Sequence, residues 1–269
     1  EAVDAAMRIF RAAVSAGDTV RSRRALSALF AISEEDVSIN GDLVGARNDP
    51  DAIIREYIQR YNNIVYVKTD QRETVYGAWN RGIRAARGKY LTNANTDDRH
   101  HPDAFHRMAA VMESWAEVGI VYFDSAITQT ENTTLERGPI TGRFRWPTFD
   151  RQLLFQICFV GPQPMWRRSL NEQFGDFDTE FVSAGDYELW LRLSDKTQFY
   201  HLPEVLGLYL ESPTSIEHKD PGLSIRESEC ARDRYWKAED GLRPRTQVPV
   251  FLERYAFPLV SVIMPTFDR

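Results

Sequence analysis

Along residues 37–123, segments with short continuous apolar runs alternate with segments whose apolar residues are three or four positions apart. Short apolar runs are typical of buried strands, and apolar residues three or four positions apart are typical of amphipathic helices. Strands are predicted over residues 37–39, 64–67, 89–93 and 119–123, and helices at Asp49–Ile58, 74–86 and 102–117. This alternation predicts an α/β fold with a mostly parallel central sheet and helices on both faces.

The second half of the chain has a less regular pattern. Residues 125–150 lack a period and predict a long loop, of a length that is often functional in a compact domain. Helices are expected over 168–173, 186–194 and 221–238, and strand-like segments over 197–202 and 205–210.

The two ends of the chain differ from this central part. We expect residues 1–18 to form a helical appendage, residues 19–238 the main domain, and residues 239–257 a linker. Residues 258–269 carry the strongest buried-strand signal, because a strand so apolar must be covered on both faces. This strand either enters the same sheet as its missing central member or opens a second domain of the same kind.

Composition narrows the class of protein. The 269 residues include 43% hydrophobic residues, enough for a full core. A net charge of -6 argues against a nucleic-acid partner, and two cysteines are too few for a disulfide framework or a zinc cage. No apolar run approaches the roughly 20 residues of a spanning helix. We therefore expect no integral membrane segment, and a cytoplasmic protein or one held peripherally at the inner membrane face.

Two adjacent carboxylates, Asp97 and Asp98, follow the predicted strand 89–93. Neighbouring carboxylates repel each other unless a proton, a hydrogen bond or a cation intervenes, and carboxylate oxygens suit Mg²⁺ and Mn²⁺. The simpler alternative is that one of them caps the helix that Pro102 begins. The two roles do not exclude each other.

Another acid, Asp186, opens the predicted helix 186–194. The helix dipole stabilises a carboxylate at this end, so capping alone would explain the residue. A carboxylate fixed beside a cleft is also what a general base for a hydroxyl nucleophile requires.

Four segments together resemble family 2 glycosyltransferases of the GT-A fold. Residues 260–269 (VSVIMPTFDR) resemble the opening strand and nucleotide-binding turn of that family, and residues 76–90 (YGAWNRGIRAARGKY) resemble the helix before its metal motif. Residues 95–98 (NTDD) stand where the DxD motif stands. Residues 165–193 (MWRRSL through GDYELWLRL) resemble the acceptor-side segment that holds the catalytic acid. The resemblance covers about residues 20–238 and the terminal strand.

This resemblance implies a role for each matched residue. Asp97 matches the acid that coordinates Mn²⁺ or Mg²⁺, and Asp186 matches the catalytic base. Asn95 stands in place of the first acid of the motif, which faces the ribose, so Asp98 becomes a candidate second metal ligand. Less specific matches are the nucleotide contacts Thr266, Asp268 and Asp42, the donor-site residues Arg72 and Asn80, and the further metal ligand His218. A lone histidine such as His218 is more often incidental.

The function implied is an inverting, metal-dependent glycosyltransferase. It would move a sugar from a nucleotide-sugar donor, with a UDP-sugar expected, to a hydroxyl of a glycan or polysaccharide acceptor. The alternative from another class is a catalytically silent GT-A domain that binds nucleotide or glycan and scaffolds an active partner, which Asn95 and the displaced strand favour. A metal-dependent phosphohydrolase is less well supported, because only His100 and His101 lie near the metal acids.

Overall fold

The computed structural model describes residues 73–95, 97–213, 215 and 219–237, parts of 55–71, and the backbone of 252–256 and 260–261. Asp42, Arg72, His218, Thr266 and Asp268 lie outside the described residues, as do the elements predicted before residue 55. Among the described helices, none has the length and apolar character needed to cross a bilayer.

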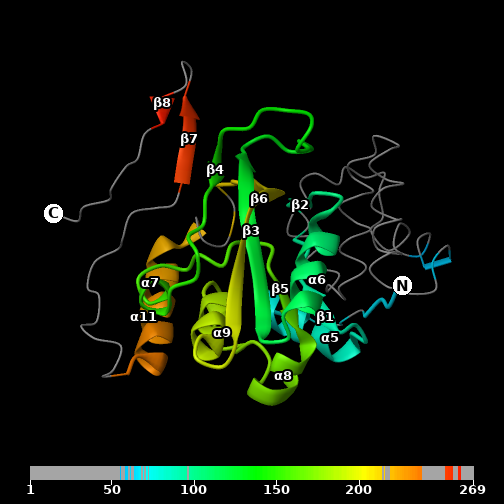
Figure 1. Cartoon of the computed structure of the whole chain (residues 1–269), viewed down its shortest axis with the longest axis vertical. Helices are drawn as coiled ribbons and strands as arrows, with labels where there is room; N and C mark the ends of the chain where they lie inside the picture. The colour runs from blue at the N-terminus through cyan, green and yellow to red at the C-terminus, as the bar shows by residue number, and fades with distance from the viewer. Residues whose placement is uncertain are drawn as a thin grey trace.

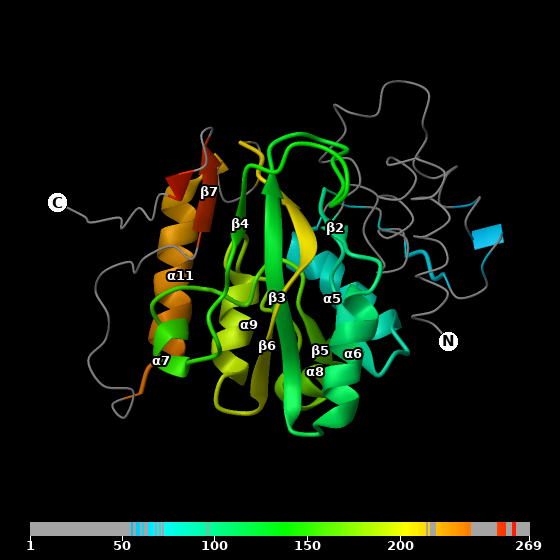
Figure 2. The ribbon, with the colours of Figure 1, turned by 45° about the horizontal axis from the view of Figure 1, so that its top comes forward.

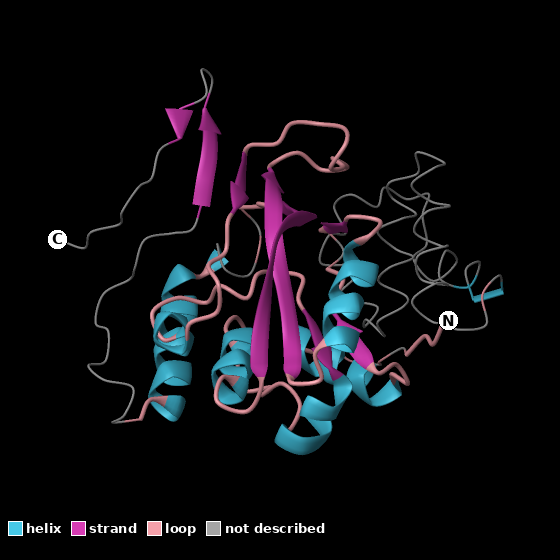
Figure 3. Cartoon of the chain, viewed as in Figure 1, coloured by secondary structure: helices cyan, strands magenta, loops and turns pink. Residues whose placement is uncertain are grey.

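The described helices and strands are labelled in Figure 1 and coloured by type in Figure 3. The helices are α5 (Val75–Ala85), α6 (Ala104–Ser114), α7 (Arg151–Leu154), α8 (Arg168–Phe174), α9 (Gly185–Leu193) and α11 (Pro221–Tyr235). The strands are β1 (Tyr90–Thr92), β2 (Arg99–His100), β3 (Val118–Thr128), β4 (Gly142–Phe144), β5 (Met165–Arg167), β6 (Gln198–Leu210), β7 (Leu252–Ala256) and β8 (Val260–Ser261).

The central strand is β3, and all 11 of its residues are buried. It pairs in parallel with β6, and antiparallel with β5 near its start and β4 near its end. The sheet order is β1-β5-β3-β4-β7-β8, with β6 joined to β3 and β2. The described strands therefore form a mixed sheet of an α/β fold, and β3–β6 is the one parallel pair among them.

Helices cover both faces of this sheet, as predicted. Successive side chains of a strand point to opposite faces. Ile120 and Tyr122 accordingly join the core cluster that contains the apolar side of α9. Val121 and Phe123 join a second cluster, with the buried residues of α6. Figure 2 shows α6 and α9 on either side of β3 and β6.

Strand β6 joins two predicted segments into one. Phe123 pairs with Leu202 and Asp124 pairs with Val205, so the ladder skips residues 203 and 204. This bulge accommodates Pro203, which has no N–H group for the ladder. Strand β3 also runs on to Thr128 and β4 follows, so the loop predicted over 125–150 is interrupted by strand.

Two other predicted elements differ from the structure. Residues 64–67 have no regular secondary structure, because an apolar run forms a strand only where another strand pairs with it. Residues 252–256, in the predicted linker, form β7. This strand pairs antiparallel with β4, and β8 pairs antiparallel with β7. The described part of the terminal strand thus lies at the outer edge of the sheet and not at its centre. The division into domains stays a prediction.

Replacing Met108 tests whether α6 closes one face of the sheet. Its side chain is 0% exposed in the core between α6 and β3. Met108→Ala should lower the free energy of unfolding by about 2–5 kcal/mol, since it leaves a cavity that closes only partly. Chemical denaturation measures the change. His106→Ala, on the exposed side of the same helix, should leave stability nearly unchanged, and equally small effects at both sites would contradict this packing.

Candidate active site

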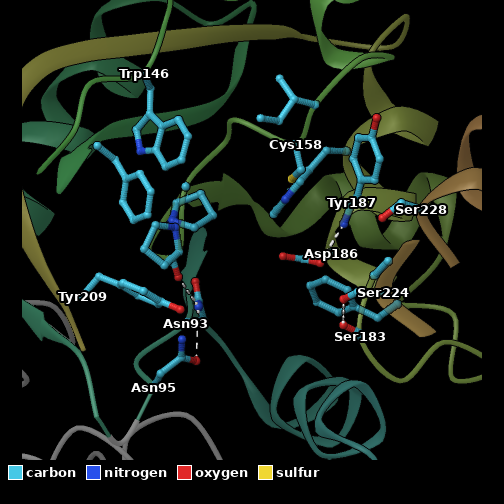
Figure 4. Close-up of a pocket in the computed structure, with 18 of the residues that line it drawn as sticks. Asn93, Asn95, Trp146, Cys158, Ser183, Asp186, Tyr187, Tyr209, Ser224 and Ser228 are labelled. Carbon is cyan, nitrogen blue, oxygen red and sulfur yellow. Dashed lines mark hydrogen bonds between the residues drawn. The ribbon is translucent and has the colours of Figure 1, made fainter. Parts of the chain in front are cut away.

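A pocket of about 520 Å³ brings together residues from three distant parts of the described chain. Asn95 comes from the loop after β1, Asp186 from the start of α9, and Arg232 from α11. Figure 4 shows Asn95 and Asp186 on different sides of this space. Asp186 and Arg232 are the only charged residues among the described residues that line it.

The carboxylate of Asp186 is held by two donors. Its Oδ1 accepts hydrogen bonds from the Tyr76 hydroxyl at 3.2 Å and from the Tyr187 backbone N–H at 2.8 Å. Burial and the negative charge of Asp186 raise the pKa of Tyr76 well above its usual range, so this hydroxyl stays a donor. A Cβ atom at Gly185 would lie 2.7 Å from the Tyr76 ring, so the close approach of tyrosine and carboxylate requires glycine there.

Asp98 faces the protein interior. Its Oδ1 accepts from the Leu210 N–H at 3.1 Å, and its Oδ2 accepts from the Asn95 amide at 2.9 Å. Burial, with the like charge of Asp97 adding to it, raises the pKa of Asp98 to about 8. A buried carboxyl whose two oxygens are both engaged by N–H donors is poorly placed to bind a metal, so the geometry does not support the metal role predicted for Asp98.

The contact between Asn95 and Asp98 explains why position 95 carries an amide where the resembling family has an acid. An aspartate at position 95 would place another carboxylate against Asp98, whereas the Asn95 amide donates to it.

The loop that carries Asn95 is anchored by two side chains. Thr92 Oγ1 donates to the Pro164 carbonyl at 2.8 Å, and Asn93 Nδ2 donates to the Pro162 carbonyl at 2.6 Å. Asn95 is therefore held in a fixed position at the pocket.

The Asn80 side chain forms hydrogen bonds with backbone groups and does not line the pocket. Its Nδ2 donates to the Phe177 carbonyl at 2.8 Å, and its Oδ1 accepts from the Phe177 N–H at 2.9 Å. Phe177 lines the pocket, and Asn80 is not among the lining residues. These two hydrogen bonds give Asn80 a structural role, and its donor contact stays a prediction.

Asp97 remains the described candidate for a divalent cation. It is half-buried and lies two residues beyond Asn95 on the same loop. No group of three or more His, Cys, Asp or Glu residues suited to a metal occurs in the described part of the chain. Mg²⁺ is commonly held by one or two carboxylates together with substrate phosphates and waters. A single carboxylate at Asp97 fits that kind of coordination.

Aromatic rings form another wall, which the sequence patterns did not predict. Phe144 stacks on Trp146, with ring centroids 4.7 Å apart and an interplanar angle of 13°, and Tyr209 meets Phe144 edge-on. The backbone N–H of Trp146 donates to Asp124 Oδ1 at 2.9 Å, and the same oxygen lies 2.8 Å from His201 Nε2. The wall is therefore anchored to the central strand.

Helix α11 is attached to α9 through Glu227, which sequence reasoning also missed. The Glu227 carboxylate accepts hydrogen bonds from the N–H groups of residues 182–184, at 2.9, 2.8 and 2.9 Å. These residues lead directly into Asp186. Ala231 is the one fully buried residue of α11 and Tyr235 packs half-buried against the core, so few apolar contacts support its attachment beside the polar ones. The weak apolar pattern of residues 221–235 was the available signal, because a helix without an apolar face needs polar partners.

Comparison with known proteins gives a consistent family match. Residues 45–174 match the model of Glycosyl transferase family 2. The uncharacterized protein y4gI of Sinorhizobium fredii is 26% identical over 240 residues, which cover 82% of this chain and 25% of that protein. Chondroitin synthase of Escherichia coli is 22% identical over 174 residues, which cover 65% of this chain and 24% of the synthase. The chain thus spans about a quarter of the length of these relatives.

Solved structures share a partial likeness. TarS 1–349 of S. aureus, in complex with UDP-GlcNAc, superposes with a TM-score of 0.48 at 12% sequence identity. The superposition covers 61% of this chain and 47% of the TarS chain.

Removing the Glu227 carboxylate should loosen the segment before α9. Glu227→Ala leaves three N–H groups without their acceptor, and hydrogen bonds to a charged group typically contribute about 1.5–3 kcal/mol. We expect a loss of unfolding free energy of that order in urea denaturation. Glu229→Ala, an exposed position on the same helix, is the matched control and should have little effect. Equal effects of the two variants would contradict the anchoring role.

Proposed function

We propose that this protein transfers a sugar from a nucleotide diphosphate donor to a hydroxyl of a glycan or polysaccharide, because residues 45–174 match the model of Glycosyl transferase family 2. The observation that carries the proposal is the shared pocket of Asn95 and Asp186. The first residue belongs to the loop expected to meet the donor, and the second is the expected base. Their meeting in one space is what a transfer between two substrates requires.

The donor is assigned to the side of the pocket formed by the loop after β1. Asn95 lines the pocket while its amide donates to Asp98, and it is assigned the hydrogen bond to a ribose hydroxyl that its acid counterpart makes in the family. Asp97 would hold Mn²⁺ or Mg²⁺, which when bound neutralises the charge of the leaving diphosphate. The donor proposed is a UDP-sugar.

Asp186 is assigned the role of general base. It accepts the proton of the acceptor hydroxyl as that oxygen forms a bond to the anomeric carbon and the bond from that carbon to the diphosphate breaks. The Tyr76 hydroxyl keeps the carboxylate oriented during this step. Asp186 is the only carboxylate among the described lining residues, so a second one is not on hand there as a nucleophile. Direct attack from the face opposite the diphosphate inverts the anomeric centre.

A silent GT-A domain that binds nucleotide or glycan and scaffolds a partner is the second candidate. The inward-facing Asp98 favours it, because this leaves Asp97 as the one metal acid of the described motif. Release of UDP from a panel of UDP-sugars with Mn²⁺ distinguishes the two, since water serves as a slow acceptor for an active enzyme. No release from any donor, with UDP still bound, would favour the silent domain.

Asp186→Asn should abolish transfer and leave UDP binding intact. The amide keeps the shape of the side chain but cannot take a proton, and loss of a general base typically costs about 10²- to 10⁴-fold in rate. UDP release and calorimetric UDP affinity are measured on the same preparation. Asp103→Asn, an exposed carboxylate outside the pocket, is the control and should keep full activity. Full activity of Asp186→Asn would remove Asp186 from the role of base.

Asp97 and Asp98 should differ in their effect on metal-dependent binding. Asp97→Ala should weaken UDP affinity in the presence of Mn²⁺ and leave the weaker affinity in EDTA unchanged. Asp98→Asn should have a much smaller effect, because the Asp98 carboxyl is engaged by Leu210 and Asn95. Titration calorimetry with and without Mn²⁺ measures both. The reverse order of effects would assign the metal to Asp98.

A further inference from the structure

We propose that α11 forms the acceptor-binding wall of the pocket and that Arg232 recognises a negatively charged group on the acceptor. This inference rests on the proposed function and adds the chemical class of the acceptor to it. The anion is a carboxylate, as in a uronic acid, or a phosphate or sulfate ester. All three present paired oxygens that match the guanidinium fork.

The position of α11 assigns this wall to the acceptor. Ser224, Ser228 and Arg232 all line the pocket, and their spacing of four residues places them on one side of the helix. Figure 4 shows Ser224 and Ser228 on the same side of the pocket as Asp186, with Asn95 across the space. If the donor lies at Asn95 and the base touches the acceptor, then the acceptor occupies the side of α11.

The side chains of this wall suit a carbohydrate. The Ser224 and Ser228 hydroxyls both donate and accept, as sugar hydroxyls require. Ser224 already bonds the Ser183 hydroxyl, which fixes its position beside the start of α9. The aromatic rings of Phe144 and Trp146, in another wall of the same pocket, offer flat apolar faces. Apolar surface with a few placed polar groups is the usual composition of a ligand site.

The charge of Arg232 is what points to an anionic acceptor. Its Nη1 donates to the Gln156 carbonyl at 3.4 Å, a long hydrogen bond, and no described carboxylate lies within 4.0 Å of its guanidinium. Neighbouring arginines are paired: Arg192 with Glu188 at 2.8 Å and Arg234 with Asp178 at 2.5 Å. A guanidinium has five N–H donors, so most of those of Arg232 remain for a ligand in the pocket.

The test compares three small probes that differ in charge. Methyl β-D-glucoside, methyl β-D-glucuronide and glucose 6-phosphate are titrated into the full chain saturated with UDP, and their affinities are measured by ligand-observed NMR. We expect at least about tenfold tighter binding of one anionic probe than of the glucoside, as charge-assisted hydrogen bonds provide. The glucuronide as the tighter anion indicates a uronic acid, and the phosphate indicates a phosphate or sulfate ester.

Variants of α11 separate recognition from folding. Arg232→Gln should remove the preference for the anion and leave UDP affinity unchanged, and Arg232→Lys should keep part of it. Arg226→Gln, an exposed arginine of the same helix that does not line the pocket, is the matched control and should keep the full preference. Circular dichroism and UDP binding confirm that each variant is folded.

Each remaining outcome overturns one of the two proposals. Equal binding of all three probes, binding of none, or an anion preference that persists in Arg232→Gln would overturn the acceptor inference while UDP still binds. Absence of both UDP binding and UDP-sugar cleavage in the wild-type chain would overturn the proposed function itself. The two failures are therefore distinguishable in the same series of measurements.

Discussion

Burial of β3 on both faces is the constraint from which the rest of the described structure follows. Every residue of this strand is buried, so its alternate side chains require a separate apolar layer on each side. α6 supplies one layer and the elements around α9 supply the other. At Asp124, where the pairing with β6 shifts register, the carboxylate turns to hold the backbone of Trp146. The same strand thus builds the core and anchors one wall of the pocket.

The candidate base illustrates how a single side chain depends on several elements. Asp186 lies in the first turn of α9, accepts a hydrogen bond from Tyr76 of α5, and follows a segment whose backbone N–H groups bind Glu227 of α11. None of these contacts is local in sequence. Gly185 completes the arrangement by leaving room for the Tyr76 ring. The position of the carboxylate is therefore a product of three helices and not of a motif alone.

The sequence predicted what is periodic and missed what depends on distant partners. α5 and α9 were predicted to within a residue at each end, because their apolar positions repeat clearly. The run at 64–67 looked equally apolar but has no pairing strand in the described structure. At the site, the resemblance indicated Asn95 and Asp186, which do share a pocket. The inward turn of Asp98 could not be anticipated, because it depends on the Leu210 N–H, which lies far along the chain.

Under the proposed function, the sparse apolar contact of α11 has a consequence for how a long product would leave. Ala231 is the one fully buried residue of this helix and Tyr235 packs half-buried against the core, so lifting α11 away from α9 would expose a limited apolar surface. Segments with few apolar contacts separate at a lower free energy than the whole domain unfolds. If the proposed acceptor is a long glycan, such a local opening would release it sideways. The loop of Asn95, tied to Pro162 and Pro164 through Asn93 and Thr92, would meanwhile keep its position. The glycan would then leave by movement of α11 alone, without movement of the loop assigned to the donor.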